Sequence, residues 1–224
     1  MRLVLASASP RRADLLRSAG FLFDTLAVDV DERVRREETP TAYVRRLAME
    51  KSERAMQILA GTTGSTMAGL KTRATSDSTG ADAMKDSSPA TGVALILGAD
   101  TAVVVDGEIL GKPGDDVEAA SMLRRLSGRS HEVLTGISLR SSSREWGRVE
   151  TTMVEFSPLT EADVVWYVAS GEGRDKAGGY AIQGLGSRFI PRIRGSYSNV
   201  VGLPIAAVHE LVAEIASEPR SGLF

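Results

Sequence analysis

Cysteine is absent from this chain of 224 residues, and histidine occurs only at His131 and His209. Without cysteine the protein has no disulfide, thiolate metal site or cysteine nucleophile. The two histidines suggest no site, because His131 begins a predicted strand and His209 lies in a predicted terminal helix. The sequence therefore excludes thiol chemistry and gives no support to a histidine-based site.

Long apolar runs are also absent, since none approaches the ~20 residues that a membrane-spanning helix needs. Residues 1–6 are apolar apart from Arg2. They nevertheless lack the long hydrophobic region and the small-residue cleavage site of a signal peptide. We therefore expect a cytoplasmic protein with no membrane partner.

An excess of charge of either sign is missing as well, because the formal net charge is −2. Proteins that bind nucleic acid along its phosphate backbone usually carry a large positive net charge. We therefore expect no stable nucleic-acid complex. Any anionic ligand must then be held by a local cluster of cations.

What is present indicates a globular α/β protein, because 42% of the residues are hydrophobic and 25% are charged. Strands and helices alternate along the chain, which predicts a mixed sheet with flanking helices. The predicted strands are 2–6, 23–28, 93–105, 108–110, 131–139, 149–156 and 189–193, and the main helices begin at 10, 40, 115 or 116, 160 and 203. The polar stretch 61–92 has little apolar periodicity and is interpreted as a flexible, dispensable insertion.

The first candidate site is the segment 7–12, Ser-Ala-Ser-Pro-Arg-Arg, where a strand runs into a helix. Ser9 suits the N-cap and Pro10 the first helical position. The helix start offers backbone N–H groups and a positive dipole end, and Arg11 and Arg12 add donors suited to phosphate oxygens. The alternative is an ordinary capped helix with solvated arginines.

Charged residues in apolar surroundings supply further candidates. Lys51 lies at the edge of a helical apolar stripe, where it either reaches solvent or points into a cleft. Asp100 interrupts an apolar strand, so it is a candidate general base or metal ligand, unless it only caps a turn. Glu32 follows a strand and is a candidate second ligand, and two carboxylates with phosphate suit Mg²⁺ or Mn²⁺.

Two later segments are rich in glycine. Lys112 lies in the tight turn Gly-Lys-Pro, and residues 171–184 contain five glycines together with Tyr180 and Gln183. Glycine lets backbone approach a ligand closely, and the Gln183 amide can read a base edge. The alternative is a flexible loop packed by Tyr180.

Taken together, these segments resemble the Maf-like nucleotide pyrophosphatases, in the right order and over nearly the whole chain outside the insertion. The resemblance rests on residues 7–16, 98–103, 111–113, 127–128, 131, 135–136, 175–184 and 195–204. It implies a mixed sheet split by a central cleft, related to the inosine triphosphate pyrophosphatase-like fold. It also implies one domain of two lobes over 1–224, and a homodimer.

The same resemblance implies which residues act. Asp100 would be the catalytic residue, and Glu32 with Asp100 would bind a divalent metal cation. The nucleoside triphosphate would contact Ser9, Arg11, Arg12, Lys51, Thr101, Lys112 and Gln183.

One family branch resembles dTTP and UTP pyrophosphatases, and another prefers 7-methyl-GTP. Four positions side with the first branch, namely Arg11, Thr101, Lys112 and Gln183. We therefore expect hydrolysis of dTTP and UTP, with Gln183 held by its neighbours so that its amide selects the base. The alternative is a nucleotide-binding regulator of cell division that does not turn its ligand over.

Overall fold

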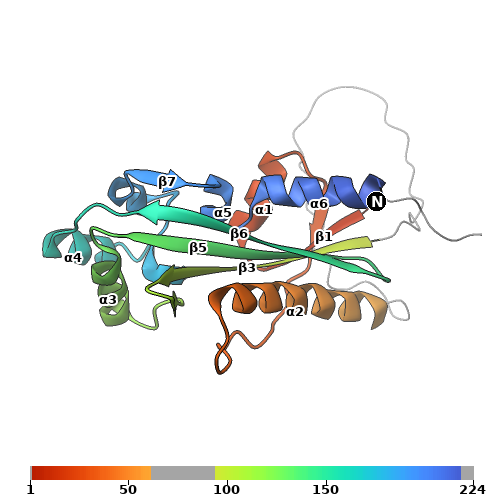
Figure 1. Cartoon of the computed structure of the whole chain (residues 1–224), viewed down its shortest axis with the longest axis horizontal. Coiled ribbons are helices and arrows are strands. Elements are labelled where there is room, and N and C mark those ends of the chain that lie inside the picture. Colours follow the sequence, from red (N-terminus) through yellow and green to blue (C-terminus); the bar gives the residue numbers. More distant parts are fainter. Residues whose placement is uncertain (1, 62–93, 218–224) are drawn as a thin grey trace, which may run out of the picture.

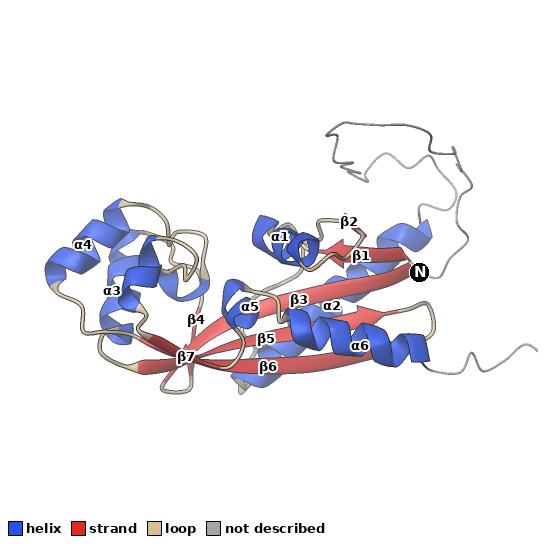
Figure 2. Ribbon diagram, turned by 90° about the horizontal axis from the view of Figure 1, so that it is seen from above, coloured by secondary structure: helices blue, strands red, loops and turns tan. Residues whose placement is uncertain are grey.

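A computed structural model describes residues 2–61 and 94–217 of the chain. Its centre is a seven-stranded sheet in the spatial order β2-β1-β3-β5-β6-β7, with β4 paired to β3 (Figures 1 and 2). β1 pairs in parallel with β2 and β3, and the other pairs are antiparallel. The predicted mixed sheet is thus confirmed. The strands are β1 (Arg2–Ala6), β2 (Phe23–Thr25), β3 (Ala94–Val105), β4 (Glu108–Leu110), β5 (Ser130–Arg140), β6 (Glu145–Glu155) and β7 (Arg192–Arg194).

Helices cover both faces of this sheet. The long α2 (Pro40–Gly61) lies along one face, and α1 (Pro10–Ser18), α5 (Tyr197–Val201) and α6 (Ile205–Ser217) lie on the other (Figure 1). α3 (Asp116–Leu126) and α4 (Glu161–Ala169) pack together at one end of the sheet (Figure 2). Since strand side chains alternate between faces, the even-numbered apolar residues of β3 pack toward α2 and the odd-numbered ones away from it.

Two glycines bring α2 unusually close to the sheet. A Cβ added to Gly98 of β3 would lie 2.1 Å from the Ala48 carbonyl oxygen, and one added to Gly136 of β5 would lie 2.2 Å from that of Val44. No larger residue fits either place without moving the helix. This close approach fixes the distance between α2 and β3, and so the reach of the side chains that α2 sends toward the strand.

One edge of β3 has a gap in its pairing. β1 pairs with β3 as far as Gly98, and β4 begins pairing at Val103. Within the described ranges, residues 99–102 therefore have a strand partner only on the β5 side. Side chains from both faces of the sheet can reach this gap.

The observed elements differ from the prediction in a few places. β3 runs without interruption through Asp100, and β2 ends at Thr25 instead of residue 28. The strand predicted at 189–193 is present as the shorter β7, which begins at Arg192, and Phe189 instead ends a 3-10 helix, η3 (Leu185–Phe189). The five-residue α5 was not predicted, because it is too short to show a helical period.

Two valines of α3 and α4 lie on the outer sides of their helices. Val117 is 78% exposed and Val165 is 64% exposed. The buried stripe of α3 contains Ala119 and Leu123, and Val117 lies two residues before it, on the opposite side of the helix. Thr160 and Asp163 form a capping box at the start of α4, whose beginning at residue 160 was predicted.

The insertion predicted at 61–92 lies outside the described residues, apart from Gly61 at the end of α2. In the described ranges, no helix combines the length and apolar character needed to cross a membrane.

Candidate active site

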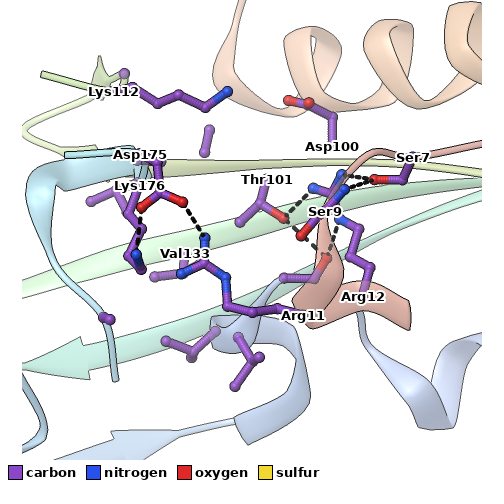
Figure 3. A pocket seen from close by; sticks show the side chains of 18 of the residues that line it. Ser7, Ser9, Arg11, Arg12, Asp100, Thr101, Lys112, Val133, Asp175 and Lys176 are labelled. Carbon is purple, nitrogen blue, oxygen red and sulfur yellow. Dashed lines mark hydrogen bonds and ion pairs between the residues drawn. The ribbon is translucent and has the colours of Figure 1, made fainter. Parts of the chain in front are cut away.

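A cavity of about 380 Å³ opens at the gap beside β3, a size usual for small-molecule sites (Figure 3). Its walls come from the end of β1, the start of α1, both faces of β3, the turn after β4 and the loop before η3. Every residue predicted to take part in the site lines it: Ser9, Arg11, Arg12, Glu32, Lys51, Asp100, Thr101, Lys112 and Gln183. The fold thus brings together residues that are far apart in the sequence, such as Ser9 and Gln183, which are separated by 174 positions.

The α2 side of the cavity holds a compact charged centre. The Lys51 Nζ donates to Asp100 Oδ1 at 2.6 Å and to Glu32 Oε1 at 2.7 Å. Lys51 and Asp100 are both buried, so Lys51 points into the cleft and does not reach outward to solvent. Burial disfavours the charge on Glu32, but the hydrogen bond and charge of Lys51 outweigh it, so the pKa of Glu32 is lowered.

These contacts also test whether the site suits a divalent cation. Because Glu32 and Asp100 both bind one ammonium, their oxygens converge on a point that one cation can occupy. Across residues 2–61 and 94–217, no cluster of three or more acidic or histidine ligands is found. Mg²⁺ is commonly bound by one or two carboxylates together with substrate phosphates and water. The carboxylate pair therefore fits Mg²⁺ or Mn²⁺ bound jointly with a triphosphate.

Lys112 extends this charged centre toward the mouth of the cavity. Its ammonium lies 3.8 Å from Glu32 Oε2, and its side chain is exposed. Figure 3 shows Lys112 and Asp100 on the same side of β3. A flexible, solvated cation in this position can follow an anionic ligand as it enters.

The segment that carries Glu32 has no regular structure and is held by two side chains of α2. Arg46 donates to the carbonyl oxygens of Asp31 at 3.4 Å and Arg33 at 3.1 Å. Tyr43 donates to the carbonyl oxygen of Glu32 itself at 2.9 Å. Three consecutive carbonyl groups are therefore fixed to the helix that also presents Lys51.

Arg46 is anchored in turn by a carboxylate. It binds Glu38 through two hydrogen bonds of 2.6 and 2.8 Å, and both side chains are largely buried. Neither Arg46 nor Tyr43 was identified from the sequence as part of the site. Helical spacing places Arg46 on the side of α2 away from the apolar stripe that Lys51 borders, so no comparable sequence signal marked it.

The opposite side of β3 carries Arg12 and Thr101. Arg12 donates to the Gly202 carbonyl oxygen at 2.8 Å, to Ser7 Oγ at 3.2 Å and to Thr101 Oγ1 at 3.1 Å. Three of the five guanidinium N–H donors are thus used within the protein. Burial lowers the pKa of Arg12. Arg12 joins α1, β3 and the turn before α6, and its contact with phosphate stays a prediction.

Ser9 occupies the predicted N-cap position of α1, but its hydroxyl makes no capping bond to the described chain. Its backbone N–H binds Ser7 Oγ at 3.2 Å. The N–H groups of the first helical turn therefore keep the capacity to bind an anion.

Arg11 and Gln183 lie farther from the charged centre. Arg11 forms a loose ion pair with Asp175, at 3.9 Å, across the cavity (Figure 3). Gln183 is exposed, and within the described residues its side chain makes no hydrogen bond. The role of Gln183 in selecting the base therefore stays a prediction.

The two histidines lie away from this chemistry, as the sequence indicates. His131 is buried between Phe156 and Tyr180, and its Nε2 is 2.7 Å from the Tyr180 hydroxyl. Burial lowers the pKa of His131 to about 4, so the ring is neutral at pH 7.

Comparison with known proteins gives one consistent result. The family model described as Maf-like protein matches residues 2–215. A protein of Syntrophus aciditrophicus named dTTP/UTP pyrophosphatase is 42% identical over 223 residues, covering 99% of this chain and 93% of that protein. Proteins of the same name from Shewanella oneidensis and Symbiobacterium thermophilum are 42% and 40% identical, covering 96% and 95% of this chain and 98% and 93% of their own lengths. The chain belongs to the Maf-like protein family.

Proposed function

We propose that this protein is a nucleoside triphosphate pyrophosphatase that hydrolyses dTTP and UTP to the nucleoside monophosphate and pyrophosphate. The observation that supports it best is the pair of carboxylates, Glu32 and Asp100, held around one ammonium in a cavity lined by arginine and lysine. A chain similar over its whole length to proteins named dTTP/UTP pyrophosphatase carries this arrangement.

In the proposed reaction, water attacks the α-phosphorus and the bond to the bridging oxygen breaks. Asp100 orients the water and accepts its proton, and pyrophosphate leaves. Lys51, Lys112 and Arg12 line the cavity on either side of β3, where their charge favours the triphosphate and the developing charge of the leaving group.

Enzymes that release pyrophosphate from nucleoside triphosphates generally depend on a divalent metal, and we propose that Glu32 and Asp100 hold it here. When bound, such a cation polarises phosphoryl oxygens and neutralises charge on the departing pyrophosphate. Lys51 donates to oxygens of the same two carboxylates, so a cation that binds there competes with it, and the negative charge of the triphosphate would favour binding of the two together.

The opposite side of the cavity would receive the base. Gln183, Thr101 and Arg11 line it there, and the Gln183 amide offers the donor and acceptor that complement O4 and N3–H of uracil and thymine. Such an enzyme removes canonical or modified pyrimidine triphosphates from the nucleotide pool. We further propose a single domain of two lobes that works as a cytoplasmic homodimer without binding nucleic acid.

The test is hydrolysis by the purified chain in ¹⁸O-labelled water with Mg²⁺ or Mn²⁺. Canonical and modified triphosphates are supplied in turn. The products are separated by ion chromatography, and the ¹⁸O content of each is determined by mass spectrometry. Attack on the α-phosphorus places the label in the monophosphate, and attack on the β-phosphorus places it in pyrophosphate. Release of inorganic phosphate, or label in pyrophosphate, contradicts the proposed reaction, and tight binding without turnover favours the regulator.

A further inference from the structure

Gln183 lies in a short turn that is fastened at both ends, although its own side chain is unattached. At the first end, the Ala181 N–H donates to the Tyr167 hydroxyl at 2.9 Å. At the second, the N–H groups of Leu185 and Gly186 donate to the carboxylate oxygens of Glu172 at 2.8 and 3.0 Å. Between the two ends, Ile182 and Gln183 line the cavity, and Gln183 is the one with a polar side chain.

The two fastening points are joined to each other. The Tyr167 hydroxyl donates to Glu172 Oε2 at 2.8 Å while it accepts from Ala181. Tyr167 comes from α4, where its ring is buried against Phe189. A continuous chain of hydrogen bonds therefore runs from one end of the turn to the other through α4.

Two glycines show how tightly the turn closes on these groups. A Cβ added to Gly184 would lie 1.8 Å from Glu172 Oε1, and one added to Gly186 would lie 2.6 Å from the Ala181 carbonyl oxygen. The carboxylate thus occupies the space that a side chain at position 184 would need. The backbone of the turn is therefore held in one conformation. Because the Gln183 side chain makes no hydrogen bond to the described residues, this backbone is what sets its direction.

Glu172 is suited to this role because it stays ionised. Burial raises the pKa of Glu172, but hydrogen bonds from Leu185 N–H, Tyr167 and Gly186 N–H outweigh that effect and leave the pKa lowered. A carboxylate has lone pairs for all three donors at once, whereas an amide has one oxygen and two N–H groups that oppose the backbone donors.

We propose that Glu172 and Tyr167 are positioning residues for base selection, which hold the turn 181–186 so that the Gln183 amide meets the pyrimidine edge in one orientation. The inference rests on the proposed function, because it assumes that Gln183 reads the base. Neither residue lines the cavity, so both act through the backbone of the turn. Loosening the turn lets the amide rotate and accept the reversed hydrogen-bond pattern of cytosine.

The test compares binding of the non-hydrolysable α,β-methylene analogues of UTP and CTP by calorimetry. The variants are Tyr167→Phe, which keeps the buried ring, and Glu172→Gln, which keeps the shape. Matched controls are Tyr197→Phe on α5 and Glu161→Gln at the start of α4, both exposed and outside the cavity. Thermal melts establish that each variant is folded.

We expect the ratio of UTP-analogue to CTP-analogue affinity to fall by about 3- to 10-fold in either variant, the loss of one or two directed hydrogen bonds. The controls should keep the wild-type ratio. In a Gln183→Ala background, Glu172→Gln should change the ratio no further, because there is no amide left to direct.

A folded variant that keeps the wild-type ratio overturns the proposal, even if its overall affinity falls. The proposal is also overturned if the wild type binds the UTP and CTP analogues with nearly equal affinity. It is overturned as well if Glu172→Gln lowers the affinity ratio as much in the Gln183→Ala background as in the wild type. Failure of the proposed function appears separately, as absence of pyrophosphate release from dTTP and UTP by the wild type.

Discussion

On the α2 side of β3 the charged side chains Lys51 and Asp100 are held by an ion pair with each other, whereas on the other side Gln183 is held only through the backbone of its turn. Lys51 and Asp100 are buried and bind at 2.6 Å. Gln183 is exposed, and only the backbone around it is fastened, by Tyr167 and Glu172. The charged residues are thus positioned by contacts between side chains, and the residue proposed to recognise the base is positioned by contacts of the backbone.

The difference follows from what each side must do. Stabilising charge that develops on phosphate requires groups fixed beforehand in a place of low dielectric. A buried carboxylate and ammonium can be kept there only as a pair, which accounts for the close contact of Asp100 with Lys51. Recognition of a base edge depends more on the orientation of hydrogen-bonding groups than on the strength of an electric field. A turn held by backbone hydrogen bonds can orient the Gln183 amide while that side chain stays in contact with solvent.

The largest expected effect is on the charged side, in Asp100→Asn. An amide cannot accept the proton of water, so we expect turnover of dTTP to fall by ~10²–10⁴-fold while the fold is kept. Pyrophosphate release measures the loss. Asp106→Asn is a matched control, because Asp106 is exposed in the β3–β4 turn with φ 54°, a conformation that asparagine also tolerates. A near wild-type rate for Asp100→Asn contradicts the assigned role.

The second effect concerns the support of Glu32. Arg46→Met leaves the Glu38 carboxylate and the carbonyl groups of Asp31 and Arg33 without their partner. We expect the free energy of unfolding to fall by ~3 kcal/mol, the scale for breaking a largely buried pair. The Mn²⁺ concentration for half-maximal activity should rise, because Glu32 is no longer held.

Urea unfolding and a Mn²⁺ titration of activity measure the two effects. Arg54→Met on the same helix is the control, because Arg54 is exposed and makes one long hydrogen bond, of 3.4 Å, to Gln57. If Arg46→Met loses stability but keeps its Mn²⁺ requirement, Arg46 supports the fold and not the position of Glu32.

The two sides also differ in how far the sequence predicts them. Asp100 and Lys51 stand out because each interrupts an apolar pattern, and the structure places both in the cavity. Arg46 was not identified, because helical spacing places it away from the apolar stripe and two of the groups that it binds are backbone carbonyl groups, which have no sequence signature. Tyr167 and Glu172 could not be found at all, since their role depends on which backbone N–H groups come near them.

The same reasoning explains the limits of the fold prediction. Long periodic segments such as α2 and β5 were found, because their burial patterns repeat over many residues. β7 and α5 have three and five residues and are stabilised by tertiary contacts such as the Asn199 side-chain bond to the Val133 carbonyl oxygen, at 2.9 Å. Local sequence carries no record of such contacts.

On the base side, Gln183→Glu should reduce kcat/KM for UTP by about tenfold. The carboxylate lacks the donor that O4 of uracil needs, and a buried group left unpaired costs ~1–3 kcal/mol. Turnover of CTP should change less, so the preference for UTP over CTP should shrink. Gln57→Glu is the control for the added charge, because Gln57 is an exposed residue of α2. Equal kcat/KM for all bases in the wild type, or a preference for 7-methyl-GTP, contradicts the assignment while leaving the pyrophosphatase reaction in place.

The smallest effect tests the packing behind the base side, where His131 contacts Phe156 and Tyr180. The pKa of folded His131 is lowered to about 4, against ~6.5 in the unfolded chain. Between these values the unfolded state binds the additional proton, so this residue's contribution destabilises the fold as pH falls from 6.5 toward 4. The loss should be ~1 kcal/mol between pH 6.5 and 5.5, and His131→Phe should remove it while keeping an aromatic ring. Urea midpoints of both proteins at the two pH values measure the difference, and equal pH slopes would show that His131 is not kept neutral by its burial.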